Sequence, residues 1–293
     1  MKTQIPNVLA LSVILAMFSI VSCTDHPIPE ETQWRLKALT RVLPENTESK
    51  FVSEFSYNPD GRITYIFTYQ APDSAGLPTE KSVYQYDQSG RLSQMERALS
   101  SLASERYVYT YNQAGQLSAI HYTGTPNDYY DLTFKYDGTG KLQNSRRYFD
   151  YFHAISYEQL ISYSFIHDNL SSIHAEATVV RAVPGTSITN TEFIYDDHKN
   201  PFYGTHIIPA PVKIASPSTG NFQHYTYAGG IDNLLHLSKN NPTSSNIKGL
   251  SQTNYTYTYH VSGMPESRMT WVKAMLDRPE VLHETLYYEY EQY

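Results

Sequence analysis

One short pattern recurs through the first half of the chain and limits what it can fold into. A tyrosine is followed by Asn or Asp, two variable positions, a glycine, a polar residue and an aliphatic residue. The copies are YNPDGRI from Tyr57, YDQSGRL from Tyr86, YNQAGQL from Tyr111 and YDGTGKL from Tyr136. The tyrosines are 29, 25 and 25 residues apart. A unit that recurs at this spacing predicts a repeat architecture.

The residues that follow each tyrosine have the chemistry of a tight turn. Asn and Asp side chains accept hydrogen bonds from backbone N–H groups two residues on. Glycine supplies the positive φ that a short hairpin loop needs. The flanking segments alternate with a period of two; FVSEFSY, for example, places Phe51, Phe55 and Tyr57 on one face. The pattern predicts β-hairpins whose structural turn residues are Asn58, Gly61, Asp87, Gly90, Asn112, Gly115, Asp137 and Gly140.

Weaker copies extend the repeat through the second half of the chain, and a strand is expected at the C-terminus. Eight units of two strands predict an all-β fold in which antiparallel β-hairpin repeats form a large, strongly curled sheet or a barrel of about 16 strands. The weaker copies are 162–173, 192–202, 224–234 and 255–269.

The pattern is lost in two places, and its period of two begins only at Phe51. Segments 203–222 and 239–249 are expected to be long loops, which are where binding residues concentrate on a regular scaffold. Residues 32–46 are expected to be an irregular lead-in rather than a helix. The repeat-built β-barrel-like domain is therefore predicted to span residues 49–293.

The N-terminus has the pattern of a secretory signal. Lys2 precedes an apolar run from Val8 to Val21, which is too short to span a membrane comfortably. Ile20-Val21-Ser22-Cys23 resembles the lipobox of bacterial lipoproteins, in which the cysteine is lipidated and begins the mature chain. The resemblance implies a signal peptide at 1–22, lipidation of Cys23, and a tether over 23–48. The alternative is an ordinary signal peptide that is cut nearby.

Composition and motifs argue against several classes of function. The formal net charge of −7 gives no basic face for a nucleic acid. The eleven histidines form no metal-ligand pattern, and Cys23 is the single cysteine. Asp196, Asp197 and Asn200 have oxygens that calcium uses, but an Asx turn is the simpler interpretation. With no nucleophile, phosphate-loop or dinucleotide motif, neither a catalytic residue nor a metal or cofactor is predicted.

The expected loops supply the candidate ligand contacts. Phe202, Tyr203, Asn240 and Asn241 lie in or beside them, and Trp271 lies on a predicted strand. Aromatic faces at a barrel rim suit the apolar face of a sugar ring. The alternative is that the loops cover one end of the barrel, and most tyrosines are expected to be structural.

The spacing of tyrosine, aspartate and glycine resembles the YD, or RHS-type, repeat of bacterial secreted and surface proteins. Together with the lipobox, DDHKNPFYG at 196–204, LSKNNPTS at 237–244 and the turn at Gly263 and Pro265, it resembles a closer family. That family is the uncharacterised lipoproteins of Gram-negative gut bacteria (Bacteroidetes) that carry a domain of unknown function with a porin-like β fold. The resemblance covers about residues 49–293 and implies a fold and a location, but no catalytic residues.

The side chains opposite the tyrosines indicate whether such a barrel meets lipid or water. Glu54, Gln85, Thr110 and Lys135 occupy that face, whereas a membrane barrel shows lipid an apolar face. The prediction is a barrel with aromatics inside and polar groups in water. Tyr293 at the C-terminus favours the alternative of an outer-membrane β-barrel, since such barrels often end in an aromatic residue.

The predicted function is a lipid-anchored cell-envelope protein that acts as a non-catalytic binding or interaction module. The expected location is the outer membrane, with the domain facing the periplasm or the cell surface. The partners are the membrane, through the anchor, and a glycan, peptide or protein ligand, but no nucleic acid. A structural envelope component is the alternative, and an enzyme has the least support.

Overall fold

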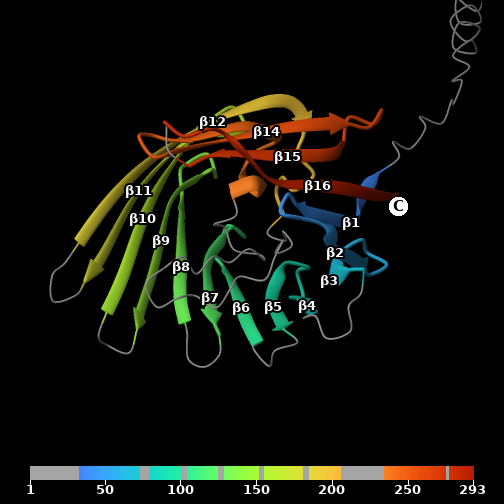
Figure 1. The fold of residues 1–293 in the computed structure, drawn as a ribbon. Helices are drawn as coiled ribbons and strands as arrows, with labels where there is room; N and C mark the ends of the chain where they lie inside the picture. Colours follow the sequence, from blue (N-terminus) through green and yellow to red (C-terminus); the bar gives the residue numbers. More distant parts are fainter. Residues whose placement is uncertain are drawn as a thin grey trace, which may run out of the picture. The chain divides into compact units, whose positions relative to one another are not determined.

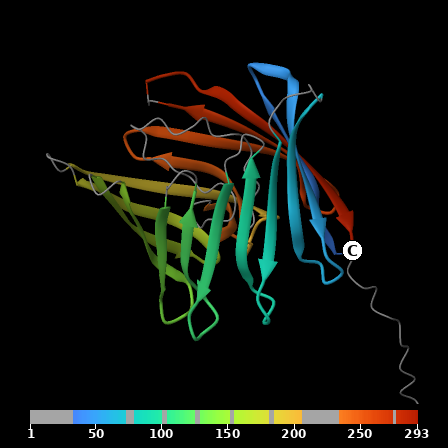
Figure 2. The same ribbon diagram turned by 90° about the horizontal axis from the view of Figure 1, so that it is seen from below.

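The structure is a closed antiparallel barrel. The computed structural model describes residues 33–72, 79–99, 104–124, 129–151, 155–180, 185–205, 234–274 and 277–293. They form sixteen strands and the 3₁₀ helix η1 (Leu234–Leu237). Each strand pairs with its neighbours in sequence, and β1 (Trp34–Leu43) pairs with β16 (Val281–Gln292), which closes the ring (Figures 1 and 2). The predicted all-β fold of about 16 antiparallel strands is confirmed, as a barrel rather than an open curled sheet.

Six of the predicted hairpins are present: β2–β3, β4–β5, β6–β7, β8–β9, β10–β11 and β14–β15. Within the described residues, no helix is both long and apolar enough to cross a membrane. The remaining strands are β2 (Asn46–Tyr57), β3 (Ile63–Ala71), β4 (Glu80–Tyr86), β5 (Leu92–Leu99), β6 (Ser104–Tyr111), β7 (Leu117–Thr123), β8 (Tyr129–Tyr136), β9 (Leu142–Tyr151), β10 (Ile155–Ile166), β11 (Asn169–Val180), β12 (Gly185–Lys199), β13 (Asn240–Ile247), β14 (Ser251–Tyr259) and β15 (Pro265–Lys273).

The repeated turn has the same geometry in each copy, as the β4–β5 hairpin illustrates. The Gly90 N–H donates to the Asp87 carbonyl at 2.9 Å, and Asp87 Oδ1 accepts from the N–H groups of Ser89 and Arg91. Gly90 has φ +75°, a left-handed conformation that disfavours residues with a Cβ. Asn58, Asn112 and Asp137 begin the equivalent turns, which end at Gly61, Gly115 and Gly140.

The tyrosine that opens each motif joins its hairpin to the preceding one. The Tyr111 hydroxyl donates to the Leu92 carbonyl at 2.8 Å, and Leu92 is the aliphatic residue that ends the previous copy of the motif. Burial raises the pKa of Tyr136 to about 12, so its hydroxyl stays protonated and remains a donor. The first and last residues of the motif are therefore partners across neighbouring repeats. The other bonds run from Tyr57 to Leu36, from Tyr86 to Ile63 and from Tyr136 to Leu117, at 2.5, 2.8 and 2.7 Å.

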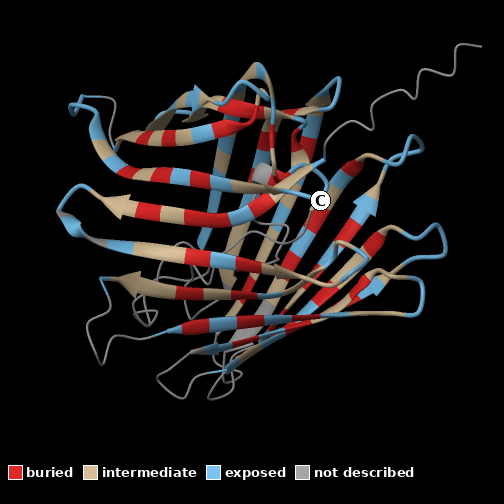
Figure 3. Ribbon diagram, turned by 90° about the vertical axis from the view of Figure 1, so that its right-hand side faces the viewer, coloured by how far each residue is buried: buried red, intermediate tan, exposed pale blue. Residues whose placement is uncertain are grey.

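Strand alternation separates the two faces of the wall (Figure 3). Inward side chains form a continuous core rich in tyrosine, in which Tyr107, Ile120 and Leu132 are at most 1% exposed. Helix η1 lies within the ring of strands, and Leu237 packs against this core (Figure 1). The outward residues Glu54, Gln85, Thr110 and Lys135 are exposed. The polar face is therefore on the outside of the barrel.

The barrel begins earlier than the sequence predicted. Residues 34–43 form β1 instead of an irregular lead-in, so the boundary expected at residue 49 was wrong and the barrel starts at Trp34. The register shifts between Leu36 and Ala38, where a bulge breaks the alternation. Leu36, Ala38 and Leu39 are all buried. The residues of this strand therefore do not alternate between apolar and polar, and the sequence pattern did not reveal it.

The second expected loop and one expected hairpin were also wrong. Residues 240–247 form β13 although most of them are polar, because β12 and β14 pair with this strand on both sides. The hairpin expected at 192–202 does not form, since β12 continues to Lys199 and no glycine supplies a turn there. The copy expected at 224–234 and most of the 203–222 loop lie outside the described residues.

Replacing Tyr111 by Phe tests the bond between hairpins. It removes the hydroxyl that Leu92 O accepts and leaves the ring in place. We expect the free energy of unfolding to fall by about 1 kcal/mol, as for one buried hydrogen bond. Urea unfolding followed by tyrosine and tryptophan fluorescence measures this.

The matched control for this variant is Tyr65→Phe. Tyr65 is an outward residue that is 38% exposed, and the described part of the chain offers its hydroxyl no hydrogen bond. We expect no measurable change in stability for the control. Equal losses in both variants would contradict the proposed role of the motif tyrosine.

Candidate functional site

The tyrosine of the β14–β15 hairpin departs from the repeated pattern. Its turn has the usual glycine, Gly263, with φ +79°. The Tyr259 hydroxyl, however, donates to the Asp196 carboxylate and not to a backbone carbonyl. The Asn241 side chain donates to the same hydroxyl, and the His198 ring stacks on Tyr259 with centroids 3.7 Å apart. We call Asp196, His198, Asn241 and Tyr259 the Tyr259 cluster.

The Tyr259 cluster fixes the end of β12 against the start of β13. The Asn241 side-chain amide donates to the Lys199 carbonyl at 3.2 Å, where the register of the two strands shifts. Asn241 is 2% exposed. Burial, and next the hydrogen bond to Asp196, raises the pKa of Tyr259. A tyrosine held in this way is a structural donor and not a base.

The oxygens considered for calcium do not converge. Asp196 Oδ1 accepts from the His198 N–H at 3.0 Å, and Asn200 Oδ1 accepts from the Phe202 N–H at 3.0 Å, so each closes its own Asx turn. Asp197 points to solvent with its side chain 96% exposed. Across the described ranges, no group of three or more His, Cys, Asp or Glu side chains is arranged to hold a metal ion.

The structure brings four of the five candidate ligand contacts to one end of the barrel and leaves the fifth apart. Phe202 is buried 6.4 Å from the Tyr288 ring, whereas Tyr203 is 46% exposed. Asn240 exchanges hydrogen bonds with Asn169, and Asn241 belongs to the Tyr259 cluster. Trp271 pairs with Asn254 at the opposite end of the β14–β15 hairpin from Tyr259. Cys23 lies outside the described residues.

The first four contacts belong to a packed crossing of two segments. The Asn200 side chain donates to the Ser238 carbonyl at 2.9 Å, and the Gly204 N–H donates to the His236 carbonyl at 3.0 Å. Ser238 and His236 are 1% and 3% exposed. This arrangement agrees with the alternative that these segments fill one end of the barrel, and it leaves only Tyr203 open to a partner.

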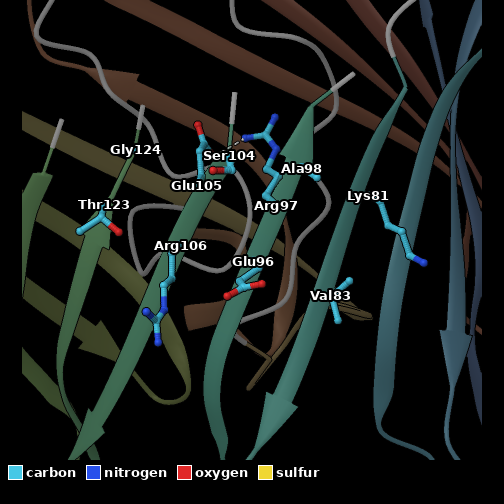
Figure 4. Close-up of a pocket in the computed structure, with 10 residues that line it drawn as sticks. All are labelled: Lys81, Val83, Glu96, Arg97, Ala98, Ser104, Glu105, Arg106, Thr123 and Gly124. Carbon is cyan, nitrogen blue, oxygen red and sulfur yellow. Dashed lines mark hydrogen bonds and ion pairs between the residues drawn. The ribbon is translucent and has the colours of Figure 1, made fainter. Parts of the chain in front are cut away.

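A pocket of about 400 Å³ lies on the wall formed by strands β4 to β7 (Figure 4). Small residues line part of it: Ala98, Ser104 and Gly124. A Cβ on Gly124 would lie 2.4 Å from the Tyr122 hydroxyl, so a larger residue there would require the Tyr122 side chain to shift. The volume is in the range of sites that bind small molecules.

Three charged side chains line this pocket on the outer face of the sheet. On the outer face, Glu96 of β5 lies directly opposite Arg106 of β6 and, on its other side, opposite Val83 of β4. Lys81 is two residues before Val83 on β4 and faces the same side. Arg106 donates through Nε to the side-chain oxygen of Gln94 at 3.0 Å, and Gln94 donates to Glu96 at 2.9 Å. Among the described residues, none of the three charged groups forms a salt bridge. We call Lys81, Glu96 and Arg106 the pocket charges.

The other two charged lining residues, Arg97 and Glu105, are already in ion pairs. The Arg97 guanidinium donates to both carboxylate oxygens of Glu80, and its third nitrogen donates to Glu105 at 3.1 Å. Burial opposes the charge on Arg97, but the bonds to Glu80 outweigh it and raise the pKa of Arg97. Arg97 and Glu105 therefore form a fixed edge of the pocket, and the pocket charges remain to meet a ligand.

Sequence reasoning missed this pocket because it placed ligand contacts in loops. The pocket charges lie at outward strand positions that each read as an ordinary solvated residue. Only the strand register brings β4, β5 and β6 side chains together.

A second charged group lies inside the barrel and is centred on one carboxylate, Glu284. Glu284 accepts from Arg41 at 2.6 Å, from Arg268 at 2.7 Å and from the Thr270 hydroxyl at 3.2 Å. Burial alone would raise the pKa of Glu284, but the Arg268 and Arg41 guanidiniums outweigh it and lower the pKa below its ordinary value. This cluster stabilises the closure of β15, β16 and β1.

The comparisons with known proteins bear on the fold. No protein-family model matches the chain, and no curated protein does. A porin-like protein from Bacteroides uniformis is 15% identical with a TM-score of 0.57, over 87% of this chain and 98% of that one. A porin-like protein from Bacteroides vulgatus is 12% identical with a TM-score of 0.36, over 88% and 99% of the chains. The TcdB2-TccC3 protein without its hypervariable C-terminal region is 13% identical with a TM-score of 0.26, over 80% of this chain and 12% of that one.

These features define the class of protein. The chain is a sixteen-stranded closed barrel with a porin-like β fold, similar in structure to the porin-like protein from Bacteroides uniformis. At this level of identity the likeness shows the fold alone.

Replacing Glu284 by Gln tests the interior ion cluster. We expect a loss of about 3–5 kcal/mol at pH 7, because two buried guanidiniums lose their carboxylate. In the wild type this stabilisation is complete above the unfolded-chain pKa of about 4.3 and is lost as the pH falls through the lowered folded pKa. Urea unfolding between pH 7 and pH 3 should therefore show the difference between wild type and variant shrinking at acidic pH.

Glu158→Gln is the surface control for that measurement. Glu158 pairs with Arg146 at 2.5 Å with both side chains at least 40% exposed, and an exposed pair contributes about 0–1 kcal/mol. A Glu284→Gln variant as stable as this control, or one whose deficit stays constant with pH, would show that Glu284 does not stabilise the closure.

Proposed function

We propose that this chain is a lipid-anchored protein of the bacterial cell envelope whose barrel stands in water and acts as a non-catalytic binding module. The observation that carries the proposal is the set of pocket charges, which face outward around a cavity of about 400 Å³ and form no salt bridge with another described residue. We assign the chain to the uncharacterised lipoproteins that its repeat and lipobox resemble. The porin-like fold and the tyrosine–glycine hairpins support this assignment.

The outer wall supports an aqueous environment. His121 and Asp131 face each other in the middle of β7 and β8 with both side chains 50% exposed, and Arg146 pairs with Glu158 on β9 and β10. An arginine on the lipid face costs about 2–4 kcal/mol at the bilayer midplane. Exposed apolar residues do not form an unbroken band, since Ile188, for example, pairs with Glu176. A barrel with this wall needs another route to the membrane.

Lipidation of Cys23 would supply that route. Several acyl chains at one residue hold a water-exposed domain firmly, whereas one chain alone is marginal. The mature protein would then face either the periplasm or the cell surface from the outer membrane.

A binding role accounts for the pocket better than the alternatives do. A purely structural barrel has no use for outward charges left unpaired around a cavity. An enzyme needs a titratable pair within hydrogen-bond reach in a cleft, and the pair lining this pocket, Arg97 and Glu105, is a neutralised ion pair. The lining residues include no aromatic ring, which favours a charged ligand over a neutral sugar.

Replacing Cys23 by Ser tests the anchor. We expect the wild-type protein to stay with the membrane fraction after a carbonate wash and the variant to move to the soluble fraction. Immunoblotting of the two fractions measures this. A variant that stays with lipid would contradict the anchor and favour a barrel that spans the outer membrane.

A ligand panel tests the binding role. The purified full chain in detergent is heated with neutral and acidic oligosaccharides and with neutral, basic and acidic peptides. We expect at least one class to raise the melting temperature, because a ligand that binds only the folded state stabilises it. An unchanged melting temperature across the whole panel would favour a structural component.

A further inference from the structure

If the chain has the proposed binding function, the pocket charges indicate which chemical class of ligand it binds. Lys81, Glu96 and Arg106 come from three successive strands, so their backbone positions are fixed by the sheet. Figure 4 shows Glu96 between Lys81 and Arg106. A bound molecule therefore meets two positive groups that flank a negative one.

The spacing of the two positive groups follows from sheet geometry. Lys81 and Arg106 are two strands and two residues apart. With strands about 4.8 Å apart and a rise of about 3.3 Å per residue, their Cα atoms are separated by about 12 Å. Two carboxylates on one short molecule can therefore pair with one cation each.

Each of the pocket charges keeps capacity for a ligand. Arg106 uses Nε and one terminal nitrogen on Gln94, which leaves its other terminal nitrogen. Glu96 uses one oxygen on Gln94 and keeps the second. The Lys81 ammonium lies 4.7 Å from the centre of the Tyr65 ring, an attraction that positions the group without neutralising it.

We propose that this pocket binds a short acidic peptide with a free ammonium group. Two of its carboxylates pair with Lys81 and Arg106, and its ammonium pairs with Glu96. The charges of such a peptide are opposite in sign to the three pocket charges that they meet. An acidic sugar matches the two cations but has no cation for Glu96. The small residues Ala98, Ser104 and Gly124 leave room for the peptide backbone.

The test is titration calorimetry of the full chain in detergent with the dipeptide Glu-Glu at low salt. We expect saturable binding that is about tenfold weaker in Lys81→Gln and in Arg106→Gln, since a charge-assisted hydrogen bond contributes at least a factor of about ten. Arg146→Gln is the matched control, because it removes the same charge from the same outer wall at a residue paired with Glu158. Binding in this control should equal the wild type.

Further ligands test which groups of the peptide the pocket requires. N-acetyl-Glu-Glu lacks the ammonium, so it should bind the wild type about tenfold more weakly than Glu-Glu does. Its affinity for the wild type and for Glu96→Gln should be equal. Free glutamate should bind more weakly than Glu-Glu because it has one carboxylate fewer and a shorter span between its carboxylates. Lys-Lys should not bind.

Two results would overturn the proposal. One is equal Glu-Glu binding by the wild type and Arg106→Gln, which would place the peptide elsewhere. The other is digalacturonate binding at least as tightly as Glu-Glu, which would make the ligand an acidic sugar. If no peptide binds while another class in the panel raises the melting temperature, this inference fails and the binding function stands. If the panel also fails, both fail.

Discussion

The first half of the barrel depends on one hydrogen bond made in four successive hairpins, from the tyrosine hydroxyl of a hairpin to a backbone carbonyl of the segment before it. Strand pairing alone decides which strands are neighbours but leaves the curvature of the sheet free. A side chain that bonds to the previous hairpin adds a constraint on the angle between neighbouring hairpins. The bond from Tyr57 to Leu36 applies the same rule at β1. The same bond thus joins neighbouring hairpins from β1 to β9, and the pairing of β1 with β16 closes the ring.

The tyrosine that lacks this bond, Tyr259, lies where the strand register is also irregular. At Tyr259 the acceptor is the Asp196 carboxylate, and strands β12 and β13 meet through a bulge that Asn241 holds. A side-chain acceptor can stand where the regular carbonyl is missing, which lets two segments far apart in sequence, around Asn200 and Ser238, cross inside the end of the barrel. The polar residues there serve packing, because their hydrogen bonds are used within the protein.

Charged side chains are stabilised differently on the inner and outer faces of the barrel. Inside, charges are expensive, so Arg97 and Glu284 are each held by opposite charges and hydrogen bonds. Outside, the pocket charges are exposed, and in the aqueous setting proposed above they form no salt bridge at little cost. A charge that is inexpensive to leave unpaired is available to a ligand, and this is why the outward wall of β4 to β6 is the better candidate for recognition than the buried arginines of the core.

The sequence by itself determined the hairpins, because turn chemistry and period-two alternation are local properties that five or six neighbouring residues specify. It therefore predicted the antiparallel fold of about 16 strands and which face of the wall is polar. It failed at β1, where a bulge beside Lys37 shifts the alternation, and at β13, where pairing on both sides makes a strand of polar residues. Only the tertiary structure decided closure, the crossing near Tyr259 and the pocket, since each depends on which strands lie side by side and in what register. Lys81, Glu96 and Arg106 are separate solvated residues along the chain and become one site only through the sheet.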